Sequence, residues 1–490
     1  MVRRTWAQWL RFFWGWLRFS CTRRWREATW DLPSGAHGPQ IDPFLSELKR
    51  QFPLPAERKE HYPNLPDPRP GKRPAPAAGG GTGWLLPRVE LTPGQLAMVE
   101  ASADRHRLVV GFPGSGKTQV LVHRADHLRH RFRVAPDSFR IFLYTNILRD
   151  YVRSALNLLD LPPESVCTFD AWCHDFYAAN IRRTVPRRSR QGRPDFDAVR
   201  KGVLDYFIRH GPPKKPLEFA LVDEGQDLPR EAYLILRWIT RHLTVFADPH
   251  QQIFDGGSSL DAIREALEVE GGAVALLGAY RNSPYVARLA ARWIDDPAER
   301  ERYLGQGCTV QKVKELPLLF MAPTFEAELD RLAQVVRGRQ ALNQRVGVLT
   351  AGNRMMEEVA SALEARGVEV ERAAPPPPAV RASGATWVRF DSITPKVVGL
   401  HNAKGLTFDC VLIPGLSREW FDWMPADLRR RLLFTGISRA TQWVYLSATE
   451  PGALPEMEGL RDCEHEGVLT VQRYAAVLPP APDTDECSLL

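Results

Sequence analysis

Long apolar runs are missing from this 490-residue chain. It has no stretch of about 18 consecutive apolar residues, so we expect no segment of it to span a membrane. Cysteine is scarce, with seven residues and no CxxC pair, and the number is odd. This pattern argues against a disulfide framework and a zinc site, and it favours reduced thiols in a cytoplasmic protein. No repeat at a solenoid period is present either, which excludes repeat architectures.

Positive charge is in excess and is unevenly distributed. The formal net charge is +7, which favours an anionic partner and leaves nucleic acid and a lipid surface both open. Residues 1–50 carry nine Lys/Arg against four Asp/Glu, so they contribute five of the seven excess charges. The overall content of apolar residues, 44%, is typical of a globular protein, and the length allows two or three domains.

The first thirty residues hold six of the fourteen tryptophans. Apolar side chains recur there at helical spacing, so we expect residues 1–50 to form a Trp- and Arg-rich helical extension. Arg11 and Arg18 interrupt the apolar core that a secretory signal needs. The helix would dock on the rest of the chain or on a protein partner. Peripheral contact with a membrane interface and a misassigned start codon are the alternatives. The apolar face consists of Trp6, Trp9, Leu10, Phe13, Trp16 and Leu17.

A linker separates this extension from the rest of the chain. Residues 51–83 contain eight prolines followed by a glycine run, a composition typical of an extended and then flexible linker. After it, short apolar runs alternate with helical stretches, which predicts an α/β fold with parallel sheets. The expected strands are 108–110, 141–144, 219–222, 244–246, 318–321, 346–349, 410–413 and 444–446.

These strands fall into two groups around residue 280, so we expect two parallel-sheet domains. The first covers residues 84–278 and includes a small insertion at about 174–218. The second covers residues 279–450. Residues 451–490 are polar and contain proline, and we expect them to form a loosely ordered tail.

The segment GFPGSGKT at residues 111–118 predicts a phosphate-binding loop. It matches G-x-x-x-x-G-K-[ST] and directly follows an expected strand, as that motif requires. Its glycines allow backbone N–H groups to point at phosphates, next to the N-terminus of a helix. Lys117 would reach the β- and γ-phosphates, and Thr118 would bind Mg²⁺. The predicted ligands are therefore ATP and Mg²⁺, and the loop glycines are Gly111, Gly114 and Gly116.

The segment LVDEGQD ends the expected strand 219–222 with acidic residues. Asp223 is placed to bind Mg²⁺, and Glu224 to act as the general base in nucleotide hydrolysis. An acidic pair at a strand end is common in proteins. The phosphate loop upstream is what makes the catalytic interpretation strong here.

The order of the remaining segments resembles the UvrD/Rep/PcrA family of superfamily 1 helicases. Eight segments follow the family order between residues 91 and 448, about three quarters of the chain. They are LTPGQLAMVE, IFLYTNILRDYV, VCTFDAWCHDF, LVDEGQD, FADPHQQIF, GAYRNS, GLHNAKGLTFD and RRLLFTGISRA.

This resemblance implies two RecA-like P-loop NTPase domains with ATP between them and single-stranded DNA across them, RNA being less favoured. It implies that Gln95 reads the adenine, that Gln251 senses the γ-phosphate and that Gly405 lies at the nucleotide. Arg281 and Arg439 would reach the ATP from the second domain as arginine fingers.

The resemblance also implies contacts with the nucleic-acid strand. For the aromatic residues, packing in the core is the alternative to stacking on bases. An arginine-rich segment at 182–190 suits phosphate contact and equally suits a solvated loop. The implied contact residues are Tyr144, Asn146, Phe169, Trp172, Phe254 and His401.

The chain departs from the family in its short insertions and in two motif positions. Only a small insertion is present in the first domain and essentially none in the second, although these insertions engage duplex in the family. Thr407 replaces a glutamate that can contact ribose, and Gly225 replaces an alanine. The expected activity is therefore an ATP-dependent translocase, or a helicase completed by a partner, with DNA repair and defence against foreign DNA as candidate settings. The alternative is a module gated by ATP and nucleic acid that signals to a partner without moving.

Overall fold

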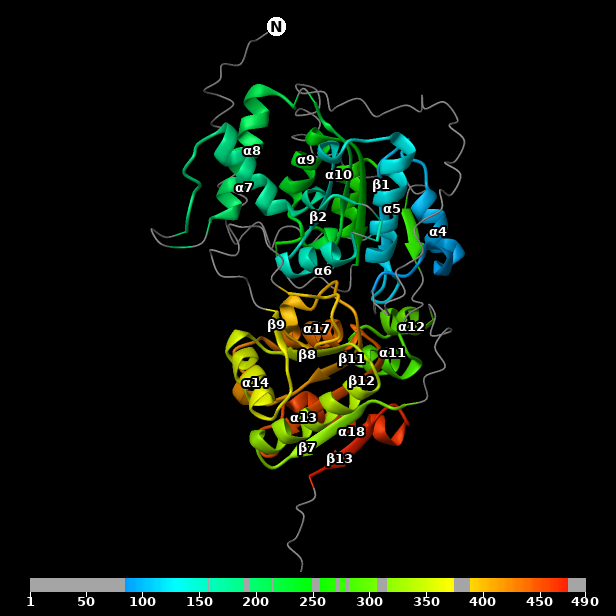
Figure 1. Ribbon diagram of the computed structural model, residues 1–490, viewed down its shortest axis with the longest axis vertical. Helices are drawn as coiled ribbons and strands as arrows, with labels where there is room; N and C mark the ends of the chain where they lie inside the picture. The colour runs from blue at the N-terminus through cyan, green and yellow to red at the C-terminus, as the bar shows by residue number, and fades with distance from the viewer. Residues whose placement is uncertain are drawn as a thin grey trace, which may run out of the picture. The chain divides into compact units, whose positions relative to one another are not determined.

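The computed structural model describes most of the chain between residues 84 and 474 (Figure 1). The described residues belong to one compact unit, Lys49–Leu490. The predictions for the helical extension 1–50 and the linker 51–83, and those for Gln251, Phe254 and Arg281, lie outside the described residues. None of the described helices is long and apolar enough to cross a membrane. The described ranges are 84–156, 158–159, 161–188, 192, 194–213, 215–248, 256–269, 274–277, 282–305, 315–373 and 388–474.

The first part of the described chain forms a six-stranded sheet in the order β3-β2-β4-β5-β1-β6, and every neighbouring pair is parallel. Strands β1 to β5 are largely buried, as expected for a sheet covered by helices on both faces. They are β1 (Arg107–Gly111), β2 (Phe139–Leu143), β3 (Val166–Thr168), β4 (Leu217–Val222), β5 (Thr240–Ala247) and β6 (Val274–Leu277).

Helices connect these strands, and local sequence explains where they begin. Thr92 and Gln95 form a capping box at the start of the first one, with Pro93 in its first turn. Thr168, Asp195 and Ser259 cap three others through their side chains. The helices are α4 (Pro93–Glu100), α5 (Lys117–Phe132), α6 (Asn146–Leu156), α7 (Phe169–Asn180), α8 (Phe196–His210), α9 (Arg230–Ile239) and α10 (Leu260–Leu267), with short 3-10 helices η1 (Arg88–Glu90), η2 (Pro136–Ser138), η3 (Pro163–Ser165) and η4 (Gly225–Asp227).

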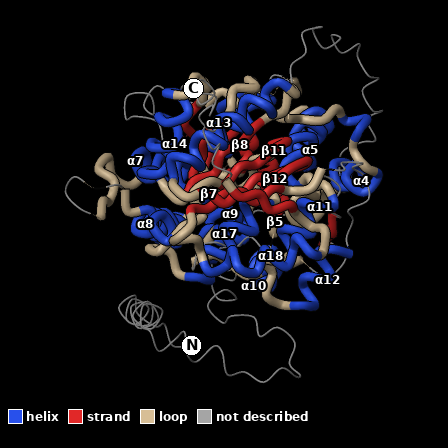
Figure 2. Tube along the Cα trace, turned by 90° about the horizontal axis from the view of Figure 1, so that it is seen from below, coloured by secondary structure: helices blue, strands red, loops and turns tan. Residues whose placement is uncertain are grey.

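The second part forms a seven-stranded parallel sheet in the order β13-β7-β12-β11-β8-β10-β9. Figure 2 shows helices around the strands of the described chain. Two parallel α/β sheets agree with the prediction, and this arrangement fits a RecA-like fold. The strands are β7 (Leu318–Ala322), β8 (Val346–Thr350), β9 (Glu371–Ala373), β10 (Lys396–Gly399), β11 (Phe408–Ile413), β12 (Ala440–Thr449) and β13 (Thr470–Arg473).

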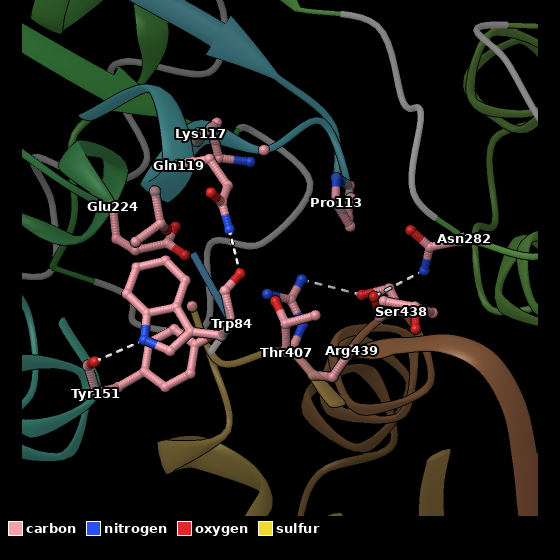
Figure 3. A pocket seen from close by; sticks show the side chains of 15 residues that line it. Trp84, Pro113, Lys117, Gln119, Tyr151, Glu224, Asn282, Thr407, Ser438 and Arg439 are labelled. Carbon is pink, nitrogen blue, oxygen red and sulfur yellow. Dashed lines mark hydrogen bonds between the residues drawn. The ribbon is translucent and has the colours of Figure 1, made fainter. Parts of the chain in front are cut away.

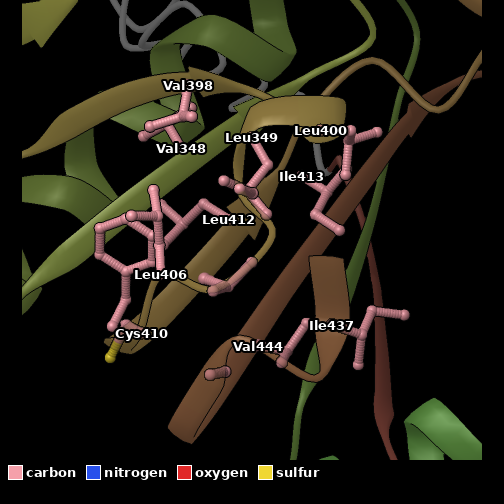
Figure 4. Close-up of a cluster of buried hydrophobic side chains, with 14 of the residues drawn as sticks. Val348, Leu349, Val398, Leu400, Leu406, Cys410, Leu412, Ile413, Ile437 and Val444 are labelled. Atoms are coloured by element: carbon pink, nitrogen blue, oxygen red, sulfur yellow. The ribbon is translucent and has the colours of Figure 1, made fainter. Parts of the chain in front are cut away.

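The core of this second sheet is aliphatic. Leu349, Ile413 and Val444 come from three neighbouring strands and pack with Ile437 from a covering helix (Figure 4). Cys410 lies in the same core, and burial raises the pKa of its thiol to about 12. The helices are α11 (Pro284–Ala291), α12 (Pro297–Gly305), α13 (Phe325–Ala341), α14 (Asn353–Ala365), α16 (Arg418–Phe421), α17 (Ala426–Ile437) and α18 (Glu458–His465), with η7 (Leu400–Asn402) and η8 (Pro455–Met457).

The prediction of a loosely ordered tail after residue 450 is wrong for residues 452–474. Helix α18 follows the loop, and β13 then pairs in parallel with β7 as an edge strand. Leu460, Cys463 and Leu469 are buried and attach this segment to the second sheet. These side chains are dispersed among polar residues, so the composition of the segment did not indicate that one face of it is buried.

Candidate active site

The predicted phosphate loop lies between β1 and α5, where its backbone is open to an anion. Gly114 and Gly116 have φ of 80° and 82°, a conformation that favours glycine. A Cβ on Gly116 would lie 2.4 Å from Nε2 of Gln95, so a side chain at this position would also clash. Helix α5 begins at Lys117 and directs its N-terminal N–H groups into the loop. The local geometry therefore fits the phosphate site that the motif predicts.

The Lys117 side chain folds into this loop. Its Nζ donates to the carbonyl oxygens of Gly111 (2.7 Å) and Phe112 (3.2 Å), and it lies 3.0 Å from Oδ2 of Asp248. Asp248 directly follows β5 and is fully buried. The sequence analysis missed Asp248, although the signal was the same as for Asp223: an acidic residue at the end of an expected strand.

Thr118 and Asp223 meet beside the loop. Thr118 Oγ1 donates to Asp223 Oδ2 at 2.8 Å. Burial, and then repulsion from Glu224, raises the pKa of Asp223 to about 6. One hydroxyl and one carboxylate at a single point are a donor set that suits Mg²⁺, which is usually bound through one or two carboxylates together with phosphates and water. The described residues contain no group of three or more His, Cys, Asp or Glu side chains arranged for a metal.

Glu224 occupies an unusual backbone position directly after Asp223. Its φ of 53° places it in the left-handed region, which is rare for a residue other than glycine and recurs at functional sites. Its Oε2 accepts a hydrogen bond from Gln226 Nε2 at 2.7 Å. Burial alone would raise the pKa of Glu224, but the charges of Lys404, Lys117 and Arg439 outweigh it and lower the pKa. The carboxylate is therefore ionised and able to accept a proton.

Lys404 connects the two sheets at this point. It lies between η7 and β11 of the second sheet, and its side chain is only 2% exposed. Its Nζ lies 2.6 Å from Oδ2 of Asp227 and 3.7 Å from Oε2 of Glu224, both from the first sheet. Burial raises the pKa of Asp227 to about 7, against the opposing charge of Lys404. This lysine lies in the segment GLHNAKGLTFD but was not among the predicted site residues.

Arg439 brings a second cation from the second sheet. Its guanidinium donates through Nε to the Thr435 carbonyl (3.0 Å) and through Nη2 to Ser438 Oγ (3.1 Å). It lines the same cavity as Lys117 and Glu224. Figure 3 shows Lys117 and Glu224 on one side of this cavity and Arg439 on the other. Burial lowers the pKa of Arg439, while Glu224 and Asp248 oppose that effect.

Asn282 braces the backbone around Arg439. Its Nδ2 donates to the carbonyl oxygens of Ser438 (2.9 Å) and Ala440 (2.8 Å), the residues on either side of Arg439. Its Oδ1 has no hydrogen-bond partner among the described residues, and the side chain lines the cavity (Figure 3). The sequence analysis missed Asn282, which directly follows the predicted Arg281.

An aromatic pair closes another side of the cavity. The Trp84 indole stacks on the Tyr151 ring with centroids 4.3 Å apart, and its Nε1 donates to the Tyr151 carbonyl at 3.0 Å. Gln119 holds the same segment by donating from Nε2 to the Trp84 carbonyl at 2.6 Å (Figure 3). Trp84 lies outside the quoted motif segments, and Tyr151 lies in IFLYTNILRDYV but was not selected, because their contact joins residues far apart in the sequence.

Gln95 and Gly405 differ in their relation to the cavity. The Gln95 amide accepts from the Thr92 N–H at 3.0 Å and donates to the Ser115 carbonyl at 2.9 Å, so it supports the phosphate loop and is not among the residues that line the cavity. Gly405 lines the cavity at φ of 78°, and a Cβ there would lie 2.7 Å from Leu148 of α6. Its position fits the prediction of a nucleotide neighbour, whereas reading of adenine by Gln95 stays a prediction.

Comparison with known families finds a similarity for part of the second sheet. Residues 397–447 match the model of the UvrD-like helicase C-terminal domain. This match confirms the resemblance to UvrD-like superfamily 1 helicases. The matched region runs from β10 into β12 and includes Lys404, Gly405 and Arg439.

A solved structure is also similar: the crystal structure of the C-terminal domain of a possible DNA helicase from Lactobacillus plantarum WCFS1. It shares 22% identity, and the match covers 39% of this chain and 98% of that chain with a TM-score of 0.29. The search of curated proteins found no match.

The matched region, residues 397–447, also holds one of the predicted nucleic-acid contacts. His401 lies in η7 just after β10 and is half-buried, with its ring stacked on Trp423. In the first sheet, Tyr144 and Asn146 follow β2, and Asn146 is exposed. Trp172 on α7 is half-buried. The structure leaves these side chains at least partly accessible, and their contact with nucleic acid stays a prediction.

The prediction of a base contact at Phe169 is wrong. Phe169 is 1% exposed and packs edge-on against Phe142 of β2, with ring centroids 5.6 Å apart. Thr168 caps α7 and places Phe169 in the first turn, facing the sheet. Phe169 is therefore a core residue, the alternative considered for the aromatic residues.

Proposed function

We propose that this protein is an ATP-dependent motor that acts on single-stranded DNA, as a translocase or as a helicase completed by a partner. One observation carries the proposal: Lys117 and Glu224 from the first sheet line the same cavity as Arg439 from the UvrD-like C-terminal domain. A phosphate-binding cation, an ionised carboxylate and a cation from the opposite domain are the groups that nucleotide hydrolysis between two domains requires.

The roles follow from the positions. The loop N–H groups and Lys117 would bind the phosphates, and Thr118 and Asp223 would hold Mg²⁺. ATP would supply the phosphoanhydride bond that is hydrolysed, and Mg²⁺ would neutralise part of the charge on the phosphates. Glu224 would orient the attacking water and accept its proton. Arg439 would stabilise charge that develops on the phosphate oxygens.

Movement would arise because two domains build one site. Arg439 and Lys404 belong to the second sheet, whereas Lys117, Glu224 and Asp227 belong to the first. Any change at the phosphate alters the contacts that favour approach of the two sheets. Cycles of binding and hydrolysis would then be coupled to cycles of closure and opening, which is how a motor advances along a strand.

A gated switch is the second candidate, and one observation favours it. Lys404 lies 3.7 Å from Glu224 and contributes to lowering the pKa of this carboxylate, which weakens it as a base. A slow hydrolase that closes on ATP and nucleic acid and signals to a partner would have this property. The two candidates differ in whether hydrolysis is fast and linked to movement.

Steady-state ATP hydrolysis tests the proposal. We expect turnover to rise strongly with single-stranded DNA and less with duplex DNA or single-stranded RNA. Lys117→Ala should lower turnover by roughly 100-fold or more, because the phosphate charge loses its cation. Arg105→Ala, at an exposed arginine of the same domain, is the matched control and should leave turnover unchanged.

Near-normal turnover in Lys117→Ala would overturn the site assignment. Turnover that no polymer stimulates, in wild-type protein that binds ATP, would favour the gated switch over the motor.

A further inference from the structure

Trp423 stands out on the surface of the UvrD-like C-terminal domain. It lies between α16 and α17, and its side chain is 61% exposed. None of the roles proposed above uses it. A single exposed apolar residue is ordinary, so the surroundings of the indole decide whether it forms a site.

The indole is held in a fixed orientation. Its Nε1 donates to the Trp420 carbonyl at 2.9 Å, and its ring is stacked near that of His401, with centroids 6.2 Å apart and planes 19° from parallel. Two aromatic rings are therefore presented together at the surface with little freedom left to lose. Stacking of a ligand on such a pair therefore costs little side-chain entropy of the protein.

The pair lies at the edge of the sheet where ligands usually bind. Strands β8 and β10 are parallel neighbours, with Thr350 opposite Gly399, and His401 follows the end of β10. Gly352 follows the end of β8, and a Cβ on it would lie 3.8 Å from Cζ2 of Trp423. Ligand sites in parallel α/β sheets lie outside the carboxyl ends of the strands.

Groups that suit a phosphate lie beside the rings. Helix α14 begins at Asn353, after Gly352, and no side chain caps its N-terminus. The guanidinium of the exposed Arg354 lies 5.3 Å from the ring centroid of Trp420, whose carbonyl holds the Trp423 indole. Glu419 and Asp422 are also exposed nearby, so the segment has no large positive field. Stacking, rather than overall charge, would therefore dominate binding here.

We propose that Trp423 and His401 form a base-stacking site for single-stranded DNA, with the start of α14 and Arg354 next to the adjoining phosphate. This inference rests on the proposed function and adds Trp423 to His401, the contact that the family resemblance already implies. Paired aromatic faces next to a phosphate-binding group are the usual elements of sequence-tolerant single-strand binding. In the first sheet, Tyr144 and Asn146 follow the carboxyl end of β2. A single-stranded DNA that crosses both domains would therefore meet the carboxyl ends of the β-strands in each sheet.

Equilibrium binding of the full chain to a fluorescein-labelled oligothymidylate, followed by fluorescence anisotropy without ATP, tests this site. Trp423→Ala should weaken binding by about 5- to 100-fold, the loss typical of one stacked base. Trp423→Phe should retain most of the affinity because it retains a stacking face. Leu342→Ala removes a side chain of similar exposure, 64%, far from the aromatic pair in the sequence, and should bind like the wild type.

Two further measurements separate stacking from other causes. On an oligonucleotide of abasic sites, wild type and Trp423→Ala should bind equally, and the salt dependence of binding should be the same for both on oligothymidylate. An equal loss on both oligonucleotides would overturn the stacking assignment and favour a role in folding or in protein contact. Wild-type affinity in Trp423→Ala would overturn the inference alone. Failure of the wild type to bind single-stranded DNA would overturn the proposed function as well.

Discussion

At the scale of single residues, the position of Arg439 depends on an amide from another element. Asn282 donates two hydrogen bonds to the carbonyls that flank Arg439, and the next N–H, from Ser283, donates to the Thr441 carbonyl at 2.8 Å. Asn282 and Ser283 are thus attached directly to the start of β12. A guanidinium that must meet developing charge needs this kind of support, because small displacements cost much of its effect.

Asn282→Ala should therefore lower the turnover number for ATP by about 5- to 100-fold and leave nucleotide affinity nearly unchanged. Loss of two hydrogen bonds of about 1 kcal/mol each sets this range. Asn282→Asp keeps Oδ1 but cannot donate to the two carbonyls, so it should be impaired at least as much. Turnover by hydrolysis assay and affinity by binding of a fluorescent nucleotide separate the two effects, with Asn180→Ala, at an exposed asparagine, as the control.

A parallel loss of nucleotide affinity in Asn282→Ala would contradict a positioning role and indicate a direct contact with bound nucleotide.

The sequence indicated the residues of the site that lie within one contiguous motif. Gly116, Lys117 and Thr118 could be predicted because the loop, the preceding strand and the following helix are adjacent in the chain. Asp248 follows an expected strand and could have been selected by that signal, although its partner Lys117 is 131 residues away. Lys404 could not, because Asp227 is 177 residues away and only the tertiary fold brings the two together.

At the scale of elements, a buried histidine links the neighbouring strands β1 and β5 near their amino ends. His106 directly precedes β1, and its Nδ1 accepts a hydrogen bond from the Leu243 N–H of β5 at 3.0 Å. Burial, assisted by the charge of Arg237, lowers the pKa of His106 to about 3. A protonated ring could not accept this hydrogen bond, so the folded chain keeps the imidazole neutral.

This arrangement predicts an acid sensitivity that one substitution reduces. Between the ordinary histidine pKa of about 6.5 and the folded value of about 3, the unfolded chain binds a proton that the folded chain does not. As the pH is lowered through this window, the contribution of His106 should therefore lower the free energy of unfolding by up to about 1.4 kcal/mol per pH unit. His106→Asn keeps an acceptor for Leu243 and should give a shallower slope.

Chemical unfolding between about pH 7 and about pH 4 measures this slope. His242 is also buried with a lowered pKa, so the variant should retain part of the pH dependence. An unchanged slope in His106→Asn would contradict the assignment.

Every interior strand of the described sheets except β10 was predicted, and the edge strands β3, β6, β9 and β13 were not. All eight expected strands are present as β1, β2, β4, β5, β7, β8, β11 and β12. Strand β13, with the sequence TVQR, is polar and half exposed because it forms an edge, so it carries no apolar signal. Strand β9 is an edge strand of three residues and was missed for the same reason.

At the scale of the whole molecule, residues from both sheets line one cavity. The buried Lys404–Asp227 pair joins the second sheet to η4 of the first, and Arg439 lines the same cavity as Lys117. The candidate strand contacts lie at the carboxyl ends of strands in both sheets. A single-stranded DNA bound across both sheets would therefore be displaced by any change in the distance between them.

The most direct test of a motor is whether ATP moves the protein along DNA. We would measure displacement of streptavidin from biotin placed at either end of a single-stranded oligonucleotide, with and without ATP. The account predicts displacement from one end only, dependent on ATP and absent in Arg439→Ala. Hydrolysis that single-stranded DNA stimulates without displacement from either end would contradict it and leave the gated switch as the function of this protein.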